Sequence, residues 1–466
     1  MKKLFLGLGA LVLGAFTLVS CGGNSNQITL WCGAESADFY EKEGNEFFKN
    51  NAEFSQFSLK AVATDAGTTP GEMITDNTKC ADIITVAHDN IGKLANQNKI
   101  KPLINEDLIN QIKNDNPENF VSVAQSTLGG DSEKRFFAVP YISQSLFLYY
   151  NKSLVTEEQA KTFEGLKEAG KAANAKGFTV TGLDGYNFSF TILALNAETK
   201  TSTLRLYNDG TRLDAYAQGD DEVALLRWSQ RIFNDPNGGL LPSDTAWAVS
   251  VQNKKVLAVV GGAWHYNAFL KSVGEENFGA TVLPTMTLTE DDVAGTTIAA
   301  GTKFQAGTFA DCKVFLINAA SDASKYNAIS ALLKHLSSTT VQNKSFKECQ
   351  NLPAYKGSSA YIESIKSEIS ANSYATATAQ LKMAEFGMPQ PFINGTLNTL
   401  YYSSGAPKLY ELCIVNEKGA YNDIRKLRET LYRMEFIWKY MEDPADNIPE
   451  TLPTPAVKAF QLMFQK

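Results

Sequence analysis

The chain has 466 residues, of which 44% are hydrophobic and 20% are charged, so it can form large apolar cores and is not disordered in composition. At about 150 residues per domain, this length fits three domains or two large lobes. Asp and Glu (50) outnumber Lys and Arg (43), and the formal charge is −7. We expect no nucleic-acid partner, because such binders carry a basic surplus. Three histidines make a His-rich metal centre unexpected, and we predict neither a metal site nor a cofactor.

The first 27 residues have the pattern of an export and anchoring signal. Lys2 and Lys3 precede an apolar run over residues 4–18, and Leu-Val-Ser-Cys follows, ending at Cys21. This order resembles the bacterial lipobox, in which the Cys is lipidated and becomes the mature N-terminus. We predict a signal peptide over 1–20, then the lipidated Cys and a polar tether over 21–27. No later apolar run reaches about 18 residues, so the remaining chain is expected to lie outside the membrane.

Five further cysteines follow, and an odd number leaves at least one unpaired. They are Cys32, Cys80, Cys312, Cys349 and Cys413. No C-x-x-C pair occurs, so zinc-binding and thioredoxin-type chemistry have no motif. We favour buried free thiols, and one or two disulfides remain an open alternative.

Short apolar runs alternate with helical patterns along the chain. The expected strands are 28–31, 82–86, 256–260 and 314–317, and the helices expected after them are 37–49, 91–98, 264–271 and 324–338. Continuous apolar strands that alternate with helices indicate parallel sheets covered on both faces. Two further extended segments, 136–150 and 280–283, are candidate crossovers between lobes, and a late helix is expected over 423–441.

Three loops come directly after expected strands, at 32–36, 87–90 and 261–266. Ligands of open α/β sheets bind beyond the carboxyl ends of the strands. The side chains in these loops include Glu35, Asp89, Trp264 and Tyr266. Carboxylates accept strong hydrogen bonds from hydroxyl groups, and aromatic rings cover the apolar face of a pyranose. The loops therefore suit a polyhydroxylated ligand.

Motifs for nucleotide binding and catalysis are incomplete. Residues 165–172 nearly match a phosphate-binding loop, but Ala172 replaces the Ser or Thr that binds magnesium, and the segment has a helical pattern. H-E-x-x-H, G-x-S-x-G and G-x-G-x-x-G do not occur. Glu35, Asp89 and Asp184 could form the carboxylate pair of a glycosidase, but sequence alone does not give their separation.

Several segments, taken in order, resemble one family. They are 28–31, 82–92, 137–140, 148–152, 262–264, 281–285, 317–321 and 388–389. Behind a lipobox, this series resembles the extracellular sugar-binding lipoproteins of bacterial ABC importers, and is similar to the maltose and maltodextrin binders. The resemblance implies an α/β, two-lobe, periplasmic-binding-protein-like (type II) fold. It implies a ligand cleft between the lobes and several hinge crossovers.

The resemblance also implies the domain limits. Lobe 1 would comprise 28–140 and 286–340, and lobe 2 would comprise 141–285 and 341–466. The crossovers would lie at 141–144, near 283–284 and near 339–344. The sugar would bind between the lobes, which would close by a hinge motion.

The resemblance carries binding roles onto individual residues. Glu35, Asp89 and Asp184 fall on carboxylates that bind sugar hydroxyls, and Tyr186 and Trp264 fall on stacking rings. The complete predicted site adds Ser36, Asn90, Gln144, Tyr266 and Asn398.

Four positions depart from the maltose binder. Val86 and Asn398 stand where it has Trp, Asn90 where it has Arg, and Gln144 where it has Glu. Losing about two aromatic platforms predicts a sugar other than a maltodextrin.

We therefore expect a monomeric, lipid-anchored binding protein, not an enzyme, on the extracytoplasmic face of a bacterial membrane. It would capture a mono- or oligosaccharide and deliver it to an ABC permease. The alternatives are a secreted glycoside hydrolase that uses two of the named carboxylates, and a binder of a polyamine or peptide. A purely structural surface protein would have no use for hinge crossovers.

Overall fold

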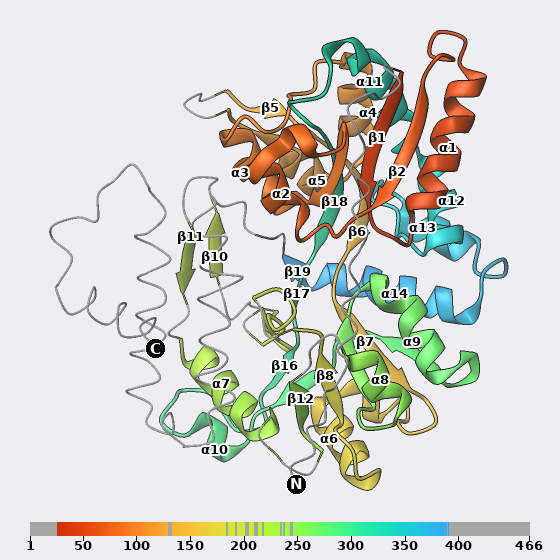
Figure 1. Cartoon of the computed structure of the whole chain (residues 1–466). Helices are drawn as coiled ribbons and strands as arrows, with labels where there is room; N and C mark the ends of the chain where they lie inside the picture. The colour runs from red at the N-terminus through yellow and green to blue at the C-terminus, as the bar shows by residue number, and fades with distance from the viewer. Residues whose placement is uncertain are drawn as a thin grey trace, which may run out of the picture.

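In the computed structural model the chain forms two α/β lobes, each built on a five-stranded sheet (Figure 1). The structure describes residues 26–128, 133–182, 185–191, 193–200, 205–208, 213–216, 219–233, 235, 238–242, 246–388 and 390. The predicted signal peptide, Cys21, Cys413 and the helix expected over 423–441 lie outside these ranges. Within them, no helix is both long and apolar enough to cross a bilayer.

The sheet of the first lobe has the order β2-β1-β3-β18-β6. Its strands are Ser58–Ala63, Gln27–Cys32, Ile83–Ala87, Asp311–Ile317 and Ala138–Gln144, in that order. Strand β1 alternates half-buried and buried residues, whereas β3 and β18 are buried along most of their length. The central strands are therefore covered on both faces, as continuous apolar runs predict.

Helices pack on this sheet because each has one apolar face. In α1 (Ala37–Asn50), Phe39, Tyr40 and Phe48 are buried against the first core. The remaining helical segments of this lobe are α2 (Thr69–Asp76), η1 (Asn77–Lys79), η2 (His88–Asn90), α3 (Ile91–Asn96), α4 (Glu106–Asp115), α5 (Glu118–Val123), η6 (Ala323–Lys325), α11 (Tyr326–Leu336) and α12 (Thr339–Cys349). Strand β4 (Gln125–Ser126) pairs antiparallel with β5 (Arg135–Phe136).

The second lobe has the sheet order β12-β8-β13-β7-β14. These strands are Leu240–Pro242, Phe178–Val180, Ala258–Gly261, Phe147–Asn151 and Phe278–Thr281. Its helical segments are η3 (Gln159–Lys161), α6 (Phe163–Ala172), α7 (Asp220–Phe233), α8 (Trp247–Gln252), η4 (Ala263–His265), α9 (Tyr266–Val273), η5 (Glu275–Asn277) and α10 (Glu290–Val293). A small sheet joins β15 (Thr285–Thr287), β16 (Lys303–Gln305) and β9 (Leu195–Asn196), and β10 (Arg205–Asn208) pairs with β11 (Leu213–Tyr216).

The near match to a phosphate-binding loop lies inside helix α6. Thr162 caps this helix, and its hydroxyl oxygen accepts a hydrogen bond from the Gly165 N–H at 2.9 Å. The helical pattern expected over 165–172 is confirmed.

The expectation of parallel sheets is wrong in part, because both sheets are mixed. Strand β18 runs antiparallel to β3 and β6, and β7 runs antiparallel to β13 and β14. Each of these strands enters its lobe from the other lobe. It therefore starts at the edge where the parallel strands end, and must run in the opposite direction.

The chain passes between the lobes at positions that differ from the expected ones. Strand β6 stays in the first sheet to Gln144, past the expected limit at 140, and β7 begins the second sheet at Phe147. Met286, Phe304 and Phe309 still pack in the second core, so the return occurs just before Asp311 and not near 283–284. The crossover expected near 339–344 falls inside α12, whose Val341 packs in the first core.

A third connection lies between the lobes (Figure 1). It contains α13 (Ser358–Ser364), α14 (Ala371–Glu385) and β19 (Gly387–Met388), and β19 pairs with β17 (Thr308–Phe309). In α14, Ala379 and Met383 pack in the second core, while Ala377 belongs to a small cluster with α12 and α13. This connection therefore ties the helices of the first lobe to the second lobe.

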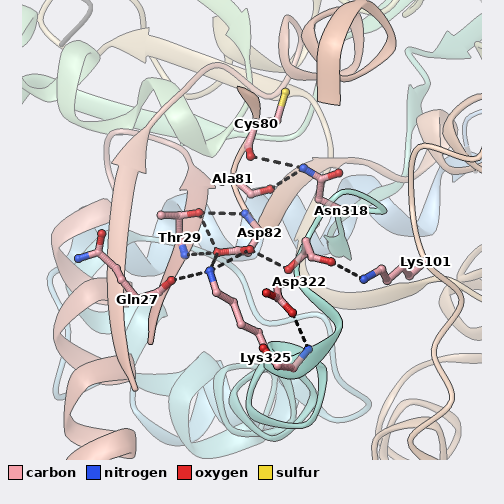
Figure 2. Close-up of polar contacts among 11 residues, drawn as sticks. Gln27, Thr29, Cys80, Ala81, Asp82, Lys101, Asn318, Asp322 and Lys325 are labelled. Carbon is pink, nitrogen blue, oxygen red and sulfur yellow. Dashed lines mark hydrogen bonds and ion pairs between the residues drawn. The ribbon is translucent and has the colours of Figure 1, made fainter. Parts of the chain in front are cut away.

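A partly buried polar network fixes the end of the first sheet where β1 and β3 begin (Figure 2). The Asp82 carboxylate accepts hydrogen bonds from Thr29 N at 2.9 Å, Ser321 Oγ at 2.7 Å and Lys325 Nζ at 3.2 Å. Lys325 Nζ also donates to the Gln27 carbonyl at 2.8 Å. The network holds the first residues of β1 against η6.

The four described cysteines that follow the lipobox are free. Cys32 and Cys312 are buried, as the favoured interpretation predicts, whereas Cys80 and Cys349 are only partly buried. Burial raises the pKa of Cys32 and Cys349 to about 12. These thiols stay protonated at neutral pH and are poor nucleophiles.

Candidate functional site

Glu35 lies in the loop between β1 and α1, with 27% of its side chain exposed. Its Oε1 is 3.8 Å from the Nζ of Lys313, which lies on β18. A β-carbon at position 33 would overlap the Glu35 carboxylate, so a larger residue than Gly33 would make this side chain shift. The first lobe thus presents a carboxylate and an ammonium group side by side at the edge of its sheet.

Asp89 lies in η2, directly after β3, and is buried. Its Oδ1 accepts a hydrogen bond from Asn90 Nδ2 at 3.0 Å. The same amide group lies 3.4 Å from the Ala87 carbonyl oxygen. Asn90 therefore holds the Asp89 carboxylate in place.

Asp311 is the first residue of β18 and is fully buried. It pairs with Gln144 at the end of β6, and its Oδ1 accepts a hydrogen bond from the Gln390 N–H at 3.2 Å. Burial raises the pKa of Asp311 well above its ordinary value, and the nearby Asp89 charge raises it further; the Gln390 N–H and the Tyr186 hydroxyl oppose this rise. Asp311 lies where all three connections between the lobes meet.

The second lobe contributes two aromatic rings. The centroids of Tyr186 and Trp264 are 6.2 Å apart, and Tyr186 stacks on Phe309 at 6.1 Å. Trp264 lies in η4, which follows β13 as the sequence predicts. Tyr186 lies between these rings and the carboxylates, because its hydroxyl group is close enough to Asp311 to lower the pKa of that carboxyl group.

We call this set of residues, contributed by both lobes, the interlobe site. It consists of Glu35, Asp89, Asn90, Tyr186, Trp264, Asp311 and Lys313. Carboxylates, an amide, an ammonium group and two rings can together bind hydroxyl groups and cover an apolar ring face.

Three other predicted ligand residues are buried, and two of them, Ser36 and Tyr266, contact other parts of the protein. Ser36 is buried, and its hydroxyl oxygen accepts a hydrogen bond from Asn351 Nδ2 at 2.9 Å. Tyr266 is buried in the second core, with its hydroxyl 3.3 Å from Ser373 Oγ. Gln144 is buried as the last residue of β6. Asp184 and Asn398 lie outside the described residues.

Replacing Ser36 with alanine is expected to lower the free energy of unfolding by about 1 kcal/mol, because the buried Asn351 amide loses an acceptor. Ligand affinity should change by less than about twofold. Denaturant unfolding and ligand titration of the same variant check both points. A large loss of ligand affinity with no change in the free energy of unfolding would show that Ser36 contacts the ligand.

Sequence reasoning missed Asp311 and Lys313. The rule that ligand loops follow strands considers only the carboxyl ends of strands. Strand β18 is antiparallel, so its amino end reaches the same edge of the sheet. The signal was present as two charged residues at the start of an otherwise apolar strand.

Two histidines beside the site, the fully buried His88 and the partly buried His265, predict a pH dependence of stability. Burial lowers the pKa of His88 and of His265 from 6.5 to about 4. His265 packs against Trp247 and Trp264, with ring centroids 4.8 and 5.5 Å away. In the unfolded chain these imidazoles bind protons below about pH 6.5, whereas in the folded chain they bind them only near pH 4. The free energy of unfolding therefore falls as the pH drops toward 4.

From pH 7 to pH 5, each of these imidazoles should lower the free energy of unfolding by about 2 kcal/mol. Asp311 acts in the opposite direction, since its raised pKa favours the folded state as the pH falls. Denaturant unfolding at both pH values should show a loss smaller by about 2 kcal/mol in His88→Gln and in His265→Gln than in the wild type. The same change at half-buried His335 should matter less. Parallel pH profiles for all variants would contradict this account.

Other features of the described ranges do not extend the site. A hollow of about 430 Å³ lies on the flank of the first lobe, away from the interlobe site. Its lining residues are Glu43, Glu46, Phe47, Asn50, Asn51, Ala52, His335 and Lys344. Among the residues that are described, no cluster of three His, Cys, Asp or Glu side chains could hold a metal ion.

Comparison with known proteins places this geometry in context. The family model described as bacterial extracellular solute-binding protein matches residues 49–376. No curated protein matches the chain.

Solved structures share the fold at low identity. A maltodextrin-binding protein from L. casei BL23, without ligand, is 20% identical, with 89% of this chain and 100% of that chain covered and a TM-score of 0.66. The Thermus thermophilus maltotriose-binding protein bound with maltotriose is 17% identical, with 88% and 99% covered and a TM-score of 0.63. MalX from Streptococcus pneumoniae, in complex with maltopentaose, is 15% identical, with 88% and 99% covered and a TM-score of 0.64. The predicted two-lobe type II fold is thus confirmed.

Proposed function

The chain belongs to the bacterial extracellular solute-binding family, and from this membership we propose that it captures a carbohydrate between its lobes and delivers it to an ABC permease. The N-terminal pattern ending at Cys21 supports a lipid anchor on the extracytoplasmic face of the membrane. The folded part would act there as a monomer.

One observation carries the proposal: hydroxyl-binding groups of the first lobe meet stacking rings of the second. Asp89 is next to Asp311, and Asp311 is next to Tyr186, whose ring lies 6.2 Å from that of Trp264. Carboxylates bind sugar hydroxyls by charge-assisted hydrogen bonds, and rings cover the C–H face. A sugar that touches both lobes would favour a closed arrangement of the lobes, because it binds that state more tightly.

Binding of this kind requires no turnover. The solved structures that share the fold and are named above are binding proteins. A glycosidase needs two carboxyl groups that reach the scissile bond, and of the three candidates Glu35, Asp89 and Asp184, Asp89 is buried. We therefore propose a binder and not a hydrolase.

A thermal-shift screen of the purified protein tests the proposal. The panel comprises neutral mono- and oligosaccharides, spermidine and a peptide mixture. A ligand present at a hundredfold excess over its Kd adds about 2.7 kcal/mol to the free energy of unfolding. We expect a selective shift with a neutral sugar and no hydrolysis product. A shift with spermidine or peptides alone, or the release of hydrolysis products, would overturn the proposal.

A further inference from the structure

We propose that Lys313 is a specificity-determining ligand contact, which pairs with Glu35 to bind two neighbouring hydroxyl groups of a neutral sugar. This inference rests on the proposed function and adds a residue and a ligand class to it. Lys313 lies on the strand whose direction sequence reasoning did not foresee.

The position of Lys313 in the sheet brings it to the site. It pairs with Ala87 of β3 on one side and with Ile142 of β6 on the other. Ala87 directly precedes the η2 turn that carries Asp89, and Ile142 is two residues before the end of β6. Lys313 therefore lies on an interior strand of the sheet, at the edge that holds the predicted ligand residues.

The ammonium group of Lys313 is poorly supplied with acceptors. Only 15% of the side chain is exposed, and its Nζ is 3.8 Å from Glu35 Oε1, which is beyond hydrogen-bond distance. Among the described residues, no hydrogen bond from this ammonium group is found, although it carries three donors. A largely buried charge is costly unless it is paired and hydrogen-bonded. A ligand that supplies acceptors would remove this cost.

Lys313 and Glu35 together select the chemistry of that ligand. Of two adjacent hydroxyl groups, one can donate to the Glu35 carboxylate while the other accepts from the Lys313 ammonium. An acidic sugar would bring its carboxylate close to Glu35, and a polyamine would bring its ammonium groups close to Lys313. Both would be repelled by a like charge a few ångströms away. A neutral vicinal diol satisfies both groups.

A purely structural role for Lys313 predicts a different result. In that case the ammonium group would only balance the Glu35 charge, and its loss would change stability without selecting among ligands. Measurements of ligand affinity and of ligand discrimination therefore distinguish a ligand contact from a structural role for Lys313.

Titration calorimetry with glucose, maltotriose, cellotriose, xylotriose, trigalacturonate and spermidine tests the inference on the full chain. We expect the wild type to bind a neutral sugar, and Lys313→Met to weaken that binding about ten- to a hundredfold, as loss of a charged hydrogen bond should. Lys303→Met is the matched control, because Lys303 is exposed on β16 and outside the site. It should leave affinity unchanged. Lys313→Arg keeps the charge and should retain part of the affinity, and thermal melting of every variant confirms that it is folded.

A monodeoxy analogue of the bound sugar provides a second readout. Removing the hydroxyl that contacts Lys313 should weaken binding to the wild type but not to Lys313→Met. If the wild type binds none of the sugars, the proposed function itself fails. If it binds a neutral sugar and Lys313→Met binds it equally well, only the inference fails. Preferred binding of trigalacturonate, lost in Lys313→Met, would overturn the neutral ligand class.

Discussion

Replacing Asp82 with alanine is expected to lower the free energy of unfolding by about 3 kcal/mol, since breaking a largely buried ion pair leaves a poorly compensated charge. Only 10% of the Asp82 side chain and 16% of the Lys325 side chain are exposed. The variant would leave Thr29 N, Ser321 Oγ and Lys325 Nζ without this acceptor (Figure 2). Urea unfolding at neutral pH measures the loss.

The matched control is Asp107→Ala in the same lobe. Asp107 also pairs with a lysine, Lys334, at 3.2 Å, but 78% of its side chain is exposed. Exposed pairs of this kind contribute about 0–1 kcal/mol. Equal losses in the two variants would show that the Asp82 network does not fix the end of the sheet.

Replacing Trp264 with alanine is expected to weaken sugar binding about thirtyfold. The side chain lies next to Tyr186 at the interlobe site and is only partly buried, so the ring can cover a ligand. Stacking of a nucleic-acid base on an aromatic ring is worth about 1–3 kcal/mol, and a sugar face should gain a similar or smaller amount. Calorimetric titration with the sugar found in the screen measures the change.

Two further variants serve as controls for the Trp264→Ala result. Trp264→Phe keeps a flat apolar ring and should retain most of the affinity. Trp31→Ala removes a partly buried tryptophan of β1 that packs against the first core, so it should reduce stability and leave affinity unchanged. Unchanged sugar affinity in Trp264→Ala would show that the Trp264 ring does not stack on the sugar.

Much of the fold could be predicted from the sequence, because apolar runs and turn residues are local signals. The expected strand at 28–31 is β1, the expected strand at 82–86 is β3, and the helix expected over 37–49 is α1. Strand direction is not a local property. Strand β18 has the same apolar run as a parallel strand, and only the path of the chain between the lobes makes it antiparallel.

The observed lobe limits differ from the expected ones because they too depend on contacts that are not local in the sequence. Prolines stand at positions 140 and 284, close to the expected connections, but tertiary pairing extends β6 to Gln144 and keeps β15 and β16 in the second lobe. The order of helices and strands can be predicted from the sequence. The residue at which the chain passes from one lobe to the other depends on contacts between distant segments.

The site was predictable to the level of loops, not of side chains. Glu35, Asp89 and Trp264 lie at the expected strand ends. Ser36 and Tyr266 lie in the same loops, yet their side chains turn into the protein. Residue type and spacing do not reveal which side chain of a loop faces the ligand, because that depends on how the next helix packs.

The most direct test of the account is a calorimetric titration of the wild-type protein with a neutral oligosaccharide, run beside spermidine. We predict saturable binding of one sugar per chain, with a negative heat-capacity change from the burial of apolar ring faces. Saturable binding of spermidine with no response to any neutral sugar would contradict the assignment of the interlobe site to carbohydrate.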